Sequence, residues 1–488
     1  MTTARSYTPY HPGLLTDLYH PDSAYVAWRA GRFDLTTFDL YARRAPFGGT
    51  YLLVAGLETA LEFVRSFHYS DVDLGFLQQI RDYDPAFLEH LRDLRFTGDI
   101  VAMPEGSIAF PNEPLLRATA PFDEALLLES GLLQAINLAT LIATKASRVV
   151  WSARGRPVAE FSLRRAQDPF VATRSSRIGG CFSTSFLGAA YRFRLPSTGT
   201  VPHALVQLFD TEHEAFEAIA DTYNRYTLLL DTYDPRAAIH TAVDVARSAR
   251  DRLGHTLAAV RIDSGDLASD ARYIRGVLDA AGLNDVRIAA SGDLDEFAIH
   301  DLLEAQAPID SFGVGTSLGV GAGSVEREIE GAALGGVYKE VFTRDHRGGH
   351  AKVKVAGDKS TWPGIKEVYR LGTFASDIIQ LADEPKPDHS ERLLRPVVLN
   401  GEIVAGSMPP LSEIWELAQA NLRRLPDEYR HLTSPKPYPV RISDAIIALR
   451  DRANADRNGI AVLDQATSVP DGARSAGTSA SLEQVAEP

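Results

Sequence analysis

Three clusters of polar residues in the middle of the chain could together bind a phosphorylated sugar. They are Arg261–Asp266, Ser291–Asp293 and Gly313–Ser317, and each follows a short apolar run. Glycine and serine offer backbone N–H groups and hydroxyls to phosphate, while aspartates can hold ribose hydroxyls or Mg²⁺. Any one cluster could equally be a turn that caps a helix, since Ser, Asp and Gly favour those positions. Three in succession favour a phosphate and sugar site.

His203 follows a glycine–threonine turn at Gly199–Thr200. A lone histidine is more often a packed core residue, but histidine can also accept a phosphoryl group or act as an acid or base. No second histidine or cysteine lies at zinc-ligand spacing nearby, so no metal held by such ligands is predicted. Arg164–Arg165, with Arg174 and Arg177 soon after, could grip a carboxylate or phosphate, or could form a solvated face. Further candidate cations are Lys339, Lys354, Lys359, Lys366 and Arg370.

The three polar clusters stand at the ends of predicted strands. The apolar, β-prone runs are Thr256–Asp263, Val286–Ala290 and Ile309–Val314, and helical patterns over Leu267–Ala281 and Asp295–Ala305 separate them. Consecutive βα units predict a parallel sheet, either open or closed into a barrel, with ligands at the C-terminal ends of its strands. The glycines of GVGTSLG only weakly favour a dehydrogenase, because they follow the third strand and lack the GxGxxG spacing.

Other segments of the chain surround this region. Short apolar pieces in Phe96–Pro121 predict the strands of a small sheet, and Phe122–Ser147 has strong helical periodicity. Polar residues interrupt the apolar stretch Ala125–Ala143, which therefore predicts a buried helix and not a membrane span. Residues 342–364 predict loops and hairpin edges, and the Ala/Ser/Gly-rich end from about Thr467 predicts a disordered tail.

Length and charge restrict the class of protein. The 488 residues are enough for two or three domains, and a formal net charge of -14 argues against a nucleic-acid or anionic-membrane surface. The N-terminus lacks the unbroken apolar core of a signal peptide. The single cysteine, Cys181, excludes an intrachain disulfide and suits a reducing compartment. We expect a cytoplasmic location.

Motifs along most of the chain resemble, in order, those of nicotinate phosphoribosyltransferases. The matching segments are Leu14–Tyr19, Arg43–Phe47, Ala55–Glu58, Phe110–Pro114, Glu129, Arg164–Gln167, Ile178–Gly180, Gly199–His203, Asp231–Asp234, Arg261–Leu267, Ser291–Leu294, Gly313–Thr316, Val337–Lys339 and Pro363–Lys366. Any one of them could be chance, but the ordered set is specific. The residues after Tyr19 (HPDSAY) depart from the family pattern, and the loop 343–351, with His346 and His350, has no match.

The resemblance implies an α/β fold, with an irregular α/β barrel of the type II phosphoribosyltransferase kind and a smaller α+β domain. The smaller domain would be built from N- and C-terminal segments. The implied parts are an N-terminal part of the smaller β-rich domain over 1–120, the catalytic barrel over 121–340, a C-terminal part of the smaller domain over 341–440, a terminal helix over 441–466 and a disordered tail over 467–488. Members are typically homodimers in which the N-terminal region of one subunit closes the active site of the other.

The resemblance also implies an activity. The reaction is ATP-coupled transfer of 5-phosphoribosyl from phosphoribosyl pyrophosphate to nicotinate, giving nicotinate mononucleotide and pyrophosphate. This is the first step of NAD salvage from nicotinate and places the enzyme in the ligase class. The implied cofactor is Mg²⁺, with ATP as a co-substrate and no nucleic-acid or membrane partner.

Residue roles carry over by position. His203 matches the family's phosphorylated histidine, Thr200 and Arg261 match residues at the nicotinate carboxylate, and Tyr19 matches an aromatic residue that covers the pyridine ring. The implied substrate-binding residues are Tyr19, Arg165, Thr200, Arg261, Ser291, Gly292, Asp293, Gly315 and Thr316, and the implied catalytic residues are His203, Asp263 and Asp266.

Related functions remain as alternatives. A nicotinamide phosphoribosyltransferase is disfavoured because Gly179–Gly188 has no acidic residue, whereas nicotinamide-using relatives place an aspartate there. A quinolinate enzyme would be shorter and would make no use of ATP. A non-catalytic, nucleotide-sensing barrel would have lost key groups, yet His203, Arg261 and Asp263 are all present.

Overall fold

A sheet of six parallel strands carries the polar clusters, and the computed structural model describes it within residues 11–354, 361–455 and 460–462. The strand order is β7-β6-β11-β10-β9-β8, and every neighbouring pair is parallel. The strands are β6 (Val158–Glu160), β7 (Ser183–Thr184), β8 (Arg225–Leu229), β9 (Thr256–Ile262), β10 (Arg287–Ala290) and β11 (Ser311–Val314). The three predicted βα units therefore form adjacent strands.

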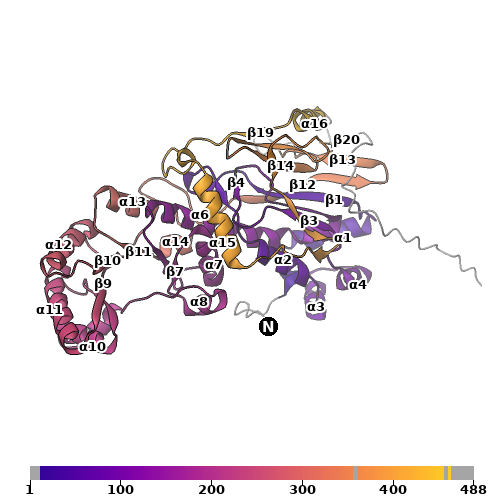
Figure 1. Cartoon of the computed structure of the whole chain (residues 1–488). Coiled ribbons are helices and arrows are strands. Elements are labelled where there is room, and N and C mark those ends of the chain that lie inside the picture. The colour runs from indigo at the N-terminus through magenta and orange to yellow at the C-terminus, as the bar shows by residue number, and fades with distance from the viewer. Residues whose placement is uncertain (1–10, 355–360, 456–459, 463–488) are drawn as a thin grey trace, which may run out of the picture.

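Helices cover the outer face of this sheet (Figure 1). They are α7 (Pro169–Gly179), α8 (Leu187–Phe193), α9 (His203–Val206), α10 (Glu212–Thr222), α11 (Pro235–Leu253), α12 (Leu267–Ala280), α13 (Glu296–Glu304) and α14 (Thr316–Gly319). Apolar residues of the strands and of α10 to α13 share one buried core. The predicted helices agree with α12 and α13 to within one residue at each end.

The short segment Ser197–His203, here called the strap, spans the mouth of the curled sheet. Ser197 forms a parallel bridge with Thr184 of β7, at one edge of the sheet. The strap then reaches Arg261 of β9 and Thr232 beyond β8, near the opposite edge. The sheet therefore curls into a half-barrel, and non-repetitive backbone links its two edges.

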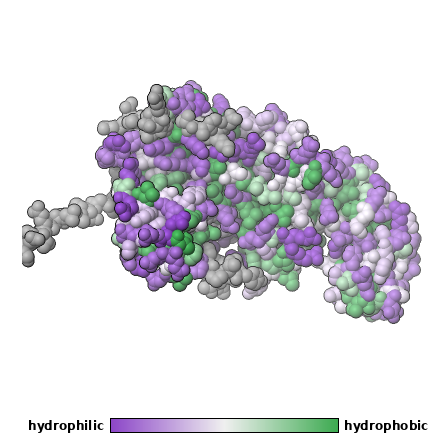
Figure 2. All heavy atoms as spheres, turned by 180° about the vertical axis from the view of Figure 1, so that it is seen from behind, coloured by the Kyte–Doolittle hydropathy of each residue, from purple (hydrophilic) through white to green (hydrophobic). Residues whose placement is uncertain are grey.

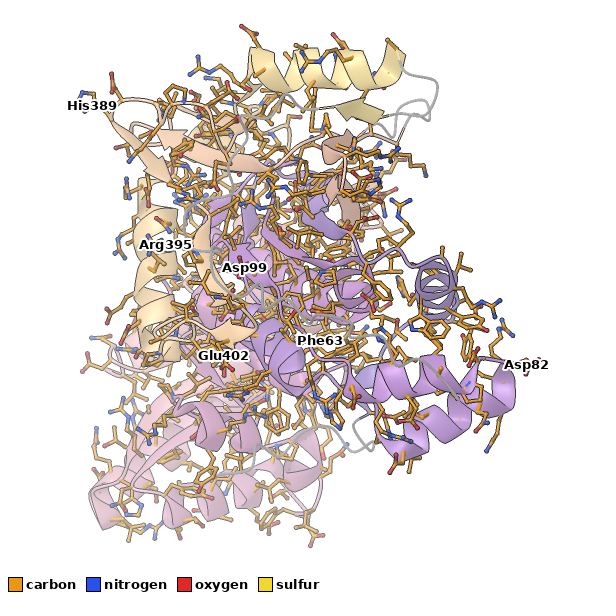
Figure 3. The ribbon with its side chains drawn as sticks, turned by 90° about the vertical axis from the view of Figure 1, so that its right-hand side faces the viewer. Phe63, Asp82, Asp99, His389, Arg395 and Glu402 are labelled. Atoms are coloured by element: carbon orange, nitrogen blue, oxygen red, sulfur yellow. The ribbon has the colours of Figure 1, made fainter. Side chains whose placement is uncertain are left out.

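The other half of the molecule is built around antiparallel strands from both ends of the chain. The order of its eight-stranded sheet is β18-β17-β3-β5-β1-β12-β13-β20. These strands are β1 (Leu35–Ala42), β3 (Asp99–Ala102), β5 (Leu116–Pro121), β12 (Gly336–Asp345), β13 (Gly348–Lys352), β17 (Arg395–Leu399), β18 (Glu402–Ile403) and β20 (Ile460–Val462). Figure 3 shows Asp99, Arg395 and Glu402 along the β18-β17-β3 edge.

Smaller elements complete this half. A second sheet contains β14 (Lys366–Leu371), β15 (Ser376–Leu381), β16 (Ser390–Arg392) and β19 (Val440–Ile442), and β2 (Leu52–Leu53) pairs with β4 (Ile108–Ala109). The helices are α1 (Tyr19–Arg29), α2 (Leu57–Ser66), α3 (Asp71–Ile80), α4 (Pro85–Asp93), α15 (Leu411–Arg424) and α16 (Asp444–Ala455). In Figure 3, Asp82 marks the outer turn between α3 and α4.

A long central helix joins the two halves. The predicted helix from Phe122 forms as α5 (Phe122–Leu127) and α6 (Glu129–Ser152), and α6 packs against both α2 and α7. The stretch Phe122–Ser152 is long and apolar enough to cross a membrane, but 67 % of its most apolar window is buried inside the molecule. It is therefore a core helix, as predicted. Figure 2 shows apolar residues gathered across the middle of the molecule, near this junction.

The hairpin predicted within residues 342–364 is confirmed by β12 and β13, which pair across a turn at residues 346–347, while residues 355–360 lie outside the described part of the chain. The α/β architecture with an additional domain agrees with the expected fold. The domain boundaries remain a prediction; β12 runs across the boundary placed at residue 340. The tail from residue 467 lies outside the described residues, as does Lys359.

Candidate active site

The C-terminal ends of the parallel strands meet at one rim of the half-barrel. Asp263 follows β9, Ser291 follows β10 and Gly315 follows β11, as the sequence predicted. Strand β6 ends beside β11 and leads into the turn that contains Arg165. This common direction brings residues that are distant in sequence to one mouth.

Arg261 lies at the centre of the rim and binds three different segments. Its Nε donates to Ser291 Oγ at 2.6 Å, Nη1 to Thr200 Oγ1 at 2.8 Å and Nη2 to Asp263 Oδ1 at 2.6 Å. A guanidinium carries five N–H donors, so one N–H remains on each terminal nitrogen. The side chain is therefore fixed and still has two donors for an anionic group.

Asp263 is an ionised carboxylate in this cluster. Partial burial acts to raise its pKa, but the hydrogen bond from Ser291 and the charge of Arg261 bring the pKa below its ordinary value. Ser291 Oγ donates to Asp263 Oδ1 at 2.5 Å, which closes a triangle with Arg261. Negative charge is thus held beside the mouth at neutral pH.

His203 lies at the end of the strap, close to Asp263. Its Nδ1 is 3.1 Å from Thr232 Oγ1, and its Nε2 is 3.9 Å from Asp263 Oδ2. The side chain is 40 % exposed, so a phosphoryl donor could reach it. Nδ1 is occupied by the threonine hydroxyl, and Nε2 is therefore the nitrogen available for chemistry.

Asp231 and Thr232 were not among the predicted site residues, although they follow β8 at the same rim. Asp231 Oδ2 accepts hydrogen bonds from the Asp263 backbone N–H at 2.8 Å and from Ser264 Oγ at 2.6 Å, while the buried Oδ1 has no hydrogen-bond partner among the described residues. The rule that ligands bind at strand C-termini would have found both, had β8 been recognised.

Gly292 has a steric reason to be glycine. Its φ is +108°, and a Cβ at this position would lie 2.2 Å from the carbonyl oxygen of Asp263. The turns after β9 and β10 therefore touch through backbone. Asp293 is exposed beside this contact, and the N-cap of α13 is Asp295.

Asp266 acts as a helix cap in this structure. Its side chain accepts from the Ser269 backbone N–H at 3.1 Å at the start of α12. The interpretation as a helix cap therefore holds for Asp266, whereas Asp263 and Ser291 bind Arg261. Asp266 is also exposed at the rim, so the cap does not exclude contact with substrate.

Gly315 and Thr316 end β11 on the β6 side of the rim. Thr316 is exposed, and Gly313 and Gly319 pack closely against Phe161 and Ser162. The turn after β6 therefore lies beside β11 and presents Arg165, whose side chain is exposed. These residues share the rim with Arg261.

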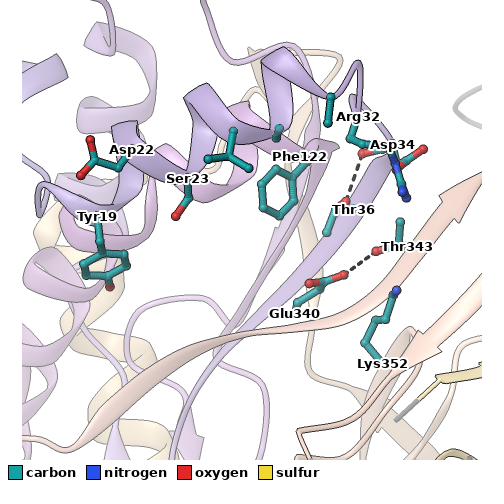
Figure 4. A pocket seen from close by; sticks show the side chains of 13 residues that line it. Tyr19, Asp22, Ser23, Arg32, Asp34, Thr36, Phe122, Glu340, Thr343 and Lys352 are labelled. Carbon is teal, nitrogen blue, oxygen red and sulfur yellow. Dashed lines mark hydrogen bonds and ion pairs between the residues drawn. The ribbon is translucent and has the colours of Figure 1, made fainter. Parts of the chain in front are cut away.

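Tyr19 is not brought to this mouth within one chain. It begins α1 in the antiparallel half, is 54 % exposed, and its ring lies 4.0 Å from that of His20. It lines a cavity of about 570 Å³ with Phe122 and Thr36 of the same half (Figure 4). Figure 1 places α1 and the strands β9 and β10 at opposite sides of the chain.

Several cations that the sequence suggested as anion ligands form contacts within the protein instead. Arg174 is buried between Glu105 and Glu58, and Arg177 stacks on Trp415 at 4.4 Å. Lys366 pairs with Asp39 at 2.7 Å, and Arg370 pairs with Asp377 at 2.6 Å, both buried. Arg174, Lys366 and Arg370 are thus committed to buried partners and are not free to grip a substrate, and the sequence does not show that Glu105 and Asp39 lie against Arg174 and Lys366.

A curled parallel sheet with an arginine, an ionised carboxylate, hydroxyls and an open histidine at its strand ends is suited to phosphate and carboxylate ligands, and the similar solved structures identify the class as phosphoribosyltransferase. Two solved structures are similar. Human Nicotinic Acid Phosphoribosyltransferase has a TM-score of 0.78 and 32 % identity, over 89 % of this chain and 99 % of that one. The nicotinate-nucleotide pyrophosphorylase from Pyrococcus furiosus has a TM-score of 0.69 and 22 % identity, over 86 % of this chain and 99 % of that one, and shares the fold.

Sequence comparisons give the family. The models of the nicotinate phosphoribosyltransferase N-terminal and C-terminal domains match residues 14–137 and 389–450. Nicotinate phosphoribosyltransferase pncB2 of Mycobacterium tuberculosis is 38 % identical over 443 residues, covering 89 % of this chain and 92 % of that protein. The Bacillus subtilis nicotinate phosphoribosyltransferase is 37 % identical, covering 88 % and 93 %. The chain belongs to the nicotinate phosphoribosyltransferase family.

Proposed function

We propose that this enzyme couples ATP hydrolysis to the transfer of 5-phosphoribosyl from phosphoribosyl pyrophosphate to nicotinate, and that the reaction occurs at the rim around Arg261. Family membership supports nicotinate and the sugar pyrophosphate as substrates. The main support for placing the reaction at this rim is the fixed guanidinium of Arg261, which keeps two N–H donors free beside Thr200. A carboxylate is a fitting partner for these donors.

The rim offers groups for each part of the reaction. As pyrophosphate leaves the anomeric carbon, positive charge builds on the ribose ring, and the ionised Asp263 can stabilise it. Exposed Arg165 and Thr316 on the β6–β11 side are suited to phosphate. We place the ribose beside Asp263 and its phosphates toward Ser291–Asp293 and Gly315–Thr316.

Mg²⁺ would be held largely by the phosphates of the substrate, because the described residues contain no group of three or more His, Cys, Asp or Glu side chains placed to bind a metal. Oxygen donors are what this ion prefers, and Asp231 supplies a buried carboxylate oxygen without a hydrogen-bond partner among the described residues. Asp231 would add one protein ligand to the phosphate oxygens, and the ion would neutralise the pyrophosphate when bound. The protein residues then need only hold the ribose and the pyridine ring in line.

His203 is the proposed phosphoryl acceptor, through Nε2. A phosphoryl group there would add roughly two negative charges close to Asp263. Repulsion between the two anions would move the end of the strap, which also holds Thr200 against Arg261. Phosphorylation would thereby change the shape of the nicotinate site, which gives ATP a physical route to act.

The test is a product assay with nicotinate, the sugar pyrophosphate and Mg²⁺, with and without ATP. We expect nicotinate mononucleotide, ATP stimulation and acid-labile phosphate on the wild-type protein. His203→Ala should lose both the stimulation and the label. Full stimulation in His203→Ala would overturn the role of His203, and a higher kcat/KM for nicotinamide than for nicotinate would overturn the assigned substrate.

A homodimer with shared sites is the proposed assembly, because Tyr19 is exposed and lies in the half of the chain away from the rim. The expected ring cover would then be Tyr19 of the partner subunit. Mixing the variants Tyr19→Ala and His203→Ala and measuring ATP-stimulated activity tests this, since a mixed dimer would contain one intact site. Recovered activity supports sharing between subunits, and its absence after subunit exchange contradicts it. We place the enzyme in the cytoplasm, in keeping with its single cysteine.

A further inference from the structure

A second cavity lies at the opposite end of the half-barrel from the rim. It has a volume of about 390 Å³ and is lined by residues from α6, α13 and α15 and from the adjoining turns. Arg154 and Gly155 line it just before β6 begins, and Gly179 lines it at the end of α7. Because the substrates' rim is at the C-terminal ends of the strands, this cavity is distinct from the proposed active site.

The lining of this cavity is cationic. Arg154, Arg423 and Arg430 contribute to it, and no Asp or Glu is among its lining residues in the described part of the chain. The protein as a whole carries a net charge of -14, so a positively charged cavity is the opposite of what the overall charge would predict. Like charges gathered in a hollow repel one another unless an anion joins them.

Arg430 is the least satisfied of these cations. Its side chain is 15 % exposed, its Nε is buried without a hydrogen-bond partner in the described residues, and Asp427 approaches only to 3.7 Å. Burial lowers its pKa below the ordinary value. The guanidinium lies 5.3 Å from the ring of Trp151, which also lines the cavity. A buried donor without a partner carries a desolvation cost that a bound anion would remove.

A buried hydroxyl adds an independent observation. Ser152 is 1 % exposed and lines the cavity, and its Oγ has no hydrogen-bond partner among the residues described. Serine near the end of a helix usually bonds to a carbonyl of the preceding turn. Here the hydroxyl remains available to a ligand in the cavity.

The ends of α6 and α7 do not account for Arg154 and Arg430. The last carbonyls of α6 accept from the backbone N–H groups of Ala153 and Arg154, and those of α7 accept from Gly180 and Cys181. Arg423 lies in the last turn of α15, where the helix dipole favours a cation, but it has no hydrogen bond or ion pair with any described residue. Arg154 pairs only with the exposed Glu304 among the described residues.

We propose that this cavity binds the dianion of a phosphate group, either inorganic phosphate or the phosphate of a nucleoside monophosphate. Arg430 and Arg423 would supply charged donors, and Ser152 would supply a hydroxyl. The volume exceeds what a single phosphate fills, and Trp151 offers a flat surface on which a base could stack. Phosphate dianions match guanidinium geometry better than chloride does.

The binding test uses Trp151 as a local reporter in the full-length enzyme. Inorganic phosphate and adenosine 5′-monophosphate are each titrated while tryptophan fluorescence is followed, and chloride at equal ionic strength is the reference. We expect saturable quenching in the wild-type protein and its loss in Trp151→Phe. Calorimetry of Trp151→Phe should still show the binding. If adenosine 5′-monophosphate binds more tightly than inorganic phosphate, the cavity recognises a nucleotide. If the two bind equally well, the cavity recognises the phosphate group alone.

Two neighbouring arginines on α15 provide a matched pair of variants. Arg423 lines the cavity and Arg424 does not, although both are exposed and carry the same charge. Arg423→Ala should weaken phosphate binding by at least about tenfold, whereas Arg424→Ala should bind as the wild type does. Both variants should keep the wild-type kcat/KM for nicotinate. Equal affinities in the two variants, or no saturable binding to the wild type, would overturn the proposal.

Discussion

Arg261 shows how one side chain can be both fixed and available. Three hydrogen bonds to Ser291, Thr200 and Asp263 hold its plane, and they come from three separate segments of the chain. Lysine would keep the charge but could not make the same three bonds, since its ammonium is a single point. The planar arrangement of the guanidinium N–H donors is therefore as important at this position as the positive charge.

We predict that Arg261→Lys raises the KM for nicotinate and lowers kcat/KM by at least about tenfold, with a smaller loss for nicotinamide. Steady-state kinetics with both pyridines measure the change. Arg287→Lys is the control, because Arg287 is exposed at the opposite end of the neighbouring strand β10. Equal losses for the two pyridines would mean that Arg261 does not read the carboxylate.

A second residue-scale prediction concerns the buried Glu113. Burial and the nearby Asp377, which accepts hydrogen bonds from Arg370 and the Tyr438 hydroxyl, raise its pKa well above the ordinary value. The folded protein thus keeps a proton that the unfolded chain releases above about pH 4.5. The free energy of unfolding should therefore fall as pH rises from there toward the raised pKa.

Glu113→Gln imitates the protonated acid and can still accept from the Phe110 backbone N–H. The variant should lose this pH-dependent decline, so its stability advantage over the wild type grows by up to about 1.4 kcal/mol per pH unit. Urea unfolding at about pH 5 and about pH 7 measures the difference. A wild-type stability that does not change between these values would show that Glu113 is ionised.

At the scale of elements, the sequence predicted the strands with the clearest apolar runs. Strands β9, β10 and β11 lie where expected, because an apolar, β-prone run marks each of them in the sequence. Strands β6 and β7, of three and two residues, are too short to leave a periodic signal. The strap has no repeating structure, so its path between the sheet edges depends on side-chain bonds that only the fold brings together.

The start of α12 supplies a prediction about an element. Asp266 both caps this helix and stands at the rim, and its two roles can be separated because asparagine caps as well as aspartate does. Asp266→Asn should keep wild-type stability while kcat falls, whereas Asp266→Ala should also lose about 1 kcal/mol of stability. Thermal unfolding and kcat are measured on both variants. Wild-type kcat in Asp266→Asn would assign Asp266 to capping alone.

At the scale of the whole molecule, the two halves are held together by a buried ion cluster. Arg174 on α7 of the half-barrel binds the buried Glu105 and the partly exposed Glu58 of the antiparallel half, and without Arg174 the charge of Glu105 would be buried unpaired. The Glu105 pKa, which burial acts to raise, stays below its ordinary value because of Arg174. Neither partner was evident from the sequence, since 69 residues separate Glu105 from Arg174.

Arg174→Met should therefore lower the free energy of unfolding by about 3–5 kcal/mol, because it leaves Glu105 buried without a counter-ion. Adding Glu105→Gln should restore part of the loss. Arg92→Met is the matched control: its partners Glu89 and Asp71 are exposed, and the cost should be far smaller because water screens this ion pair. Chemical denaturation compares the variants, and equal costs for Arg174→Met and Arg92→Met would contradict the role of the buried cluster.

The bond from Arg261 to Thr200 has a consequence for the order of events. An incoming pyridine acid would accept the free N–H of the same terminal nitrogen that already donates to Thr200, and the same strap ends at His203. A change at His203 therefore alters the position of Thr200 beside the bound acid. We expect the acid to enter last, once the activated sugar and the phosphorylated histidine have set the position of the threonine, so that initial-rate patterns are those of a compulsory sequence and not of random addition.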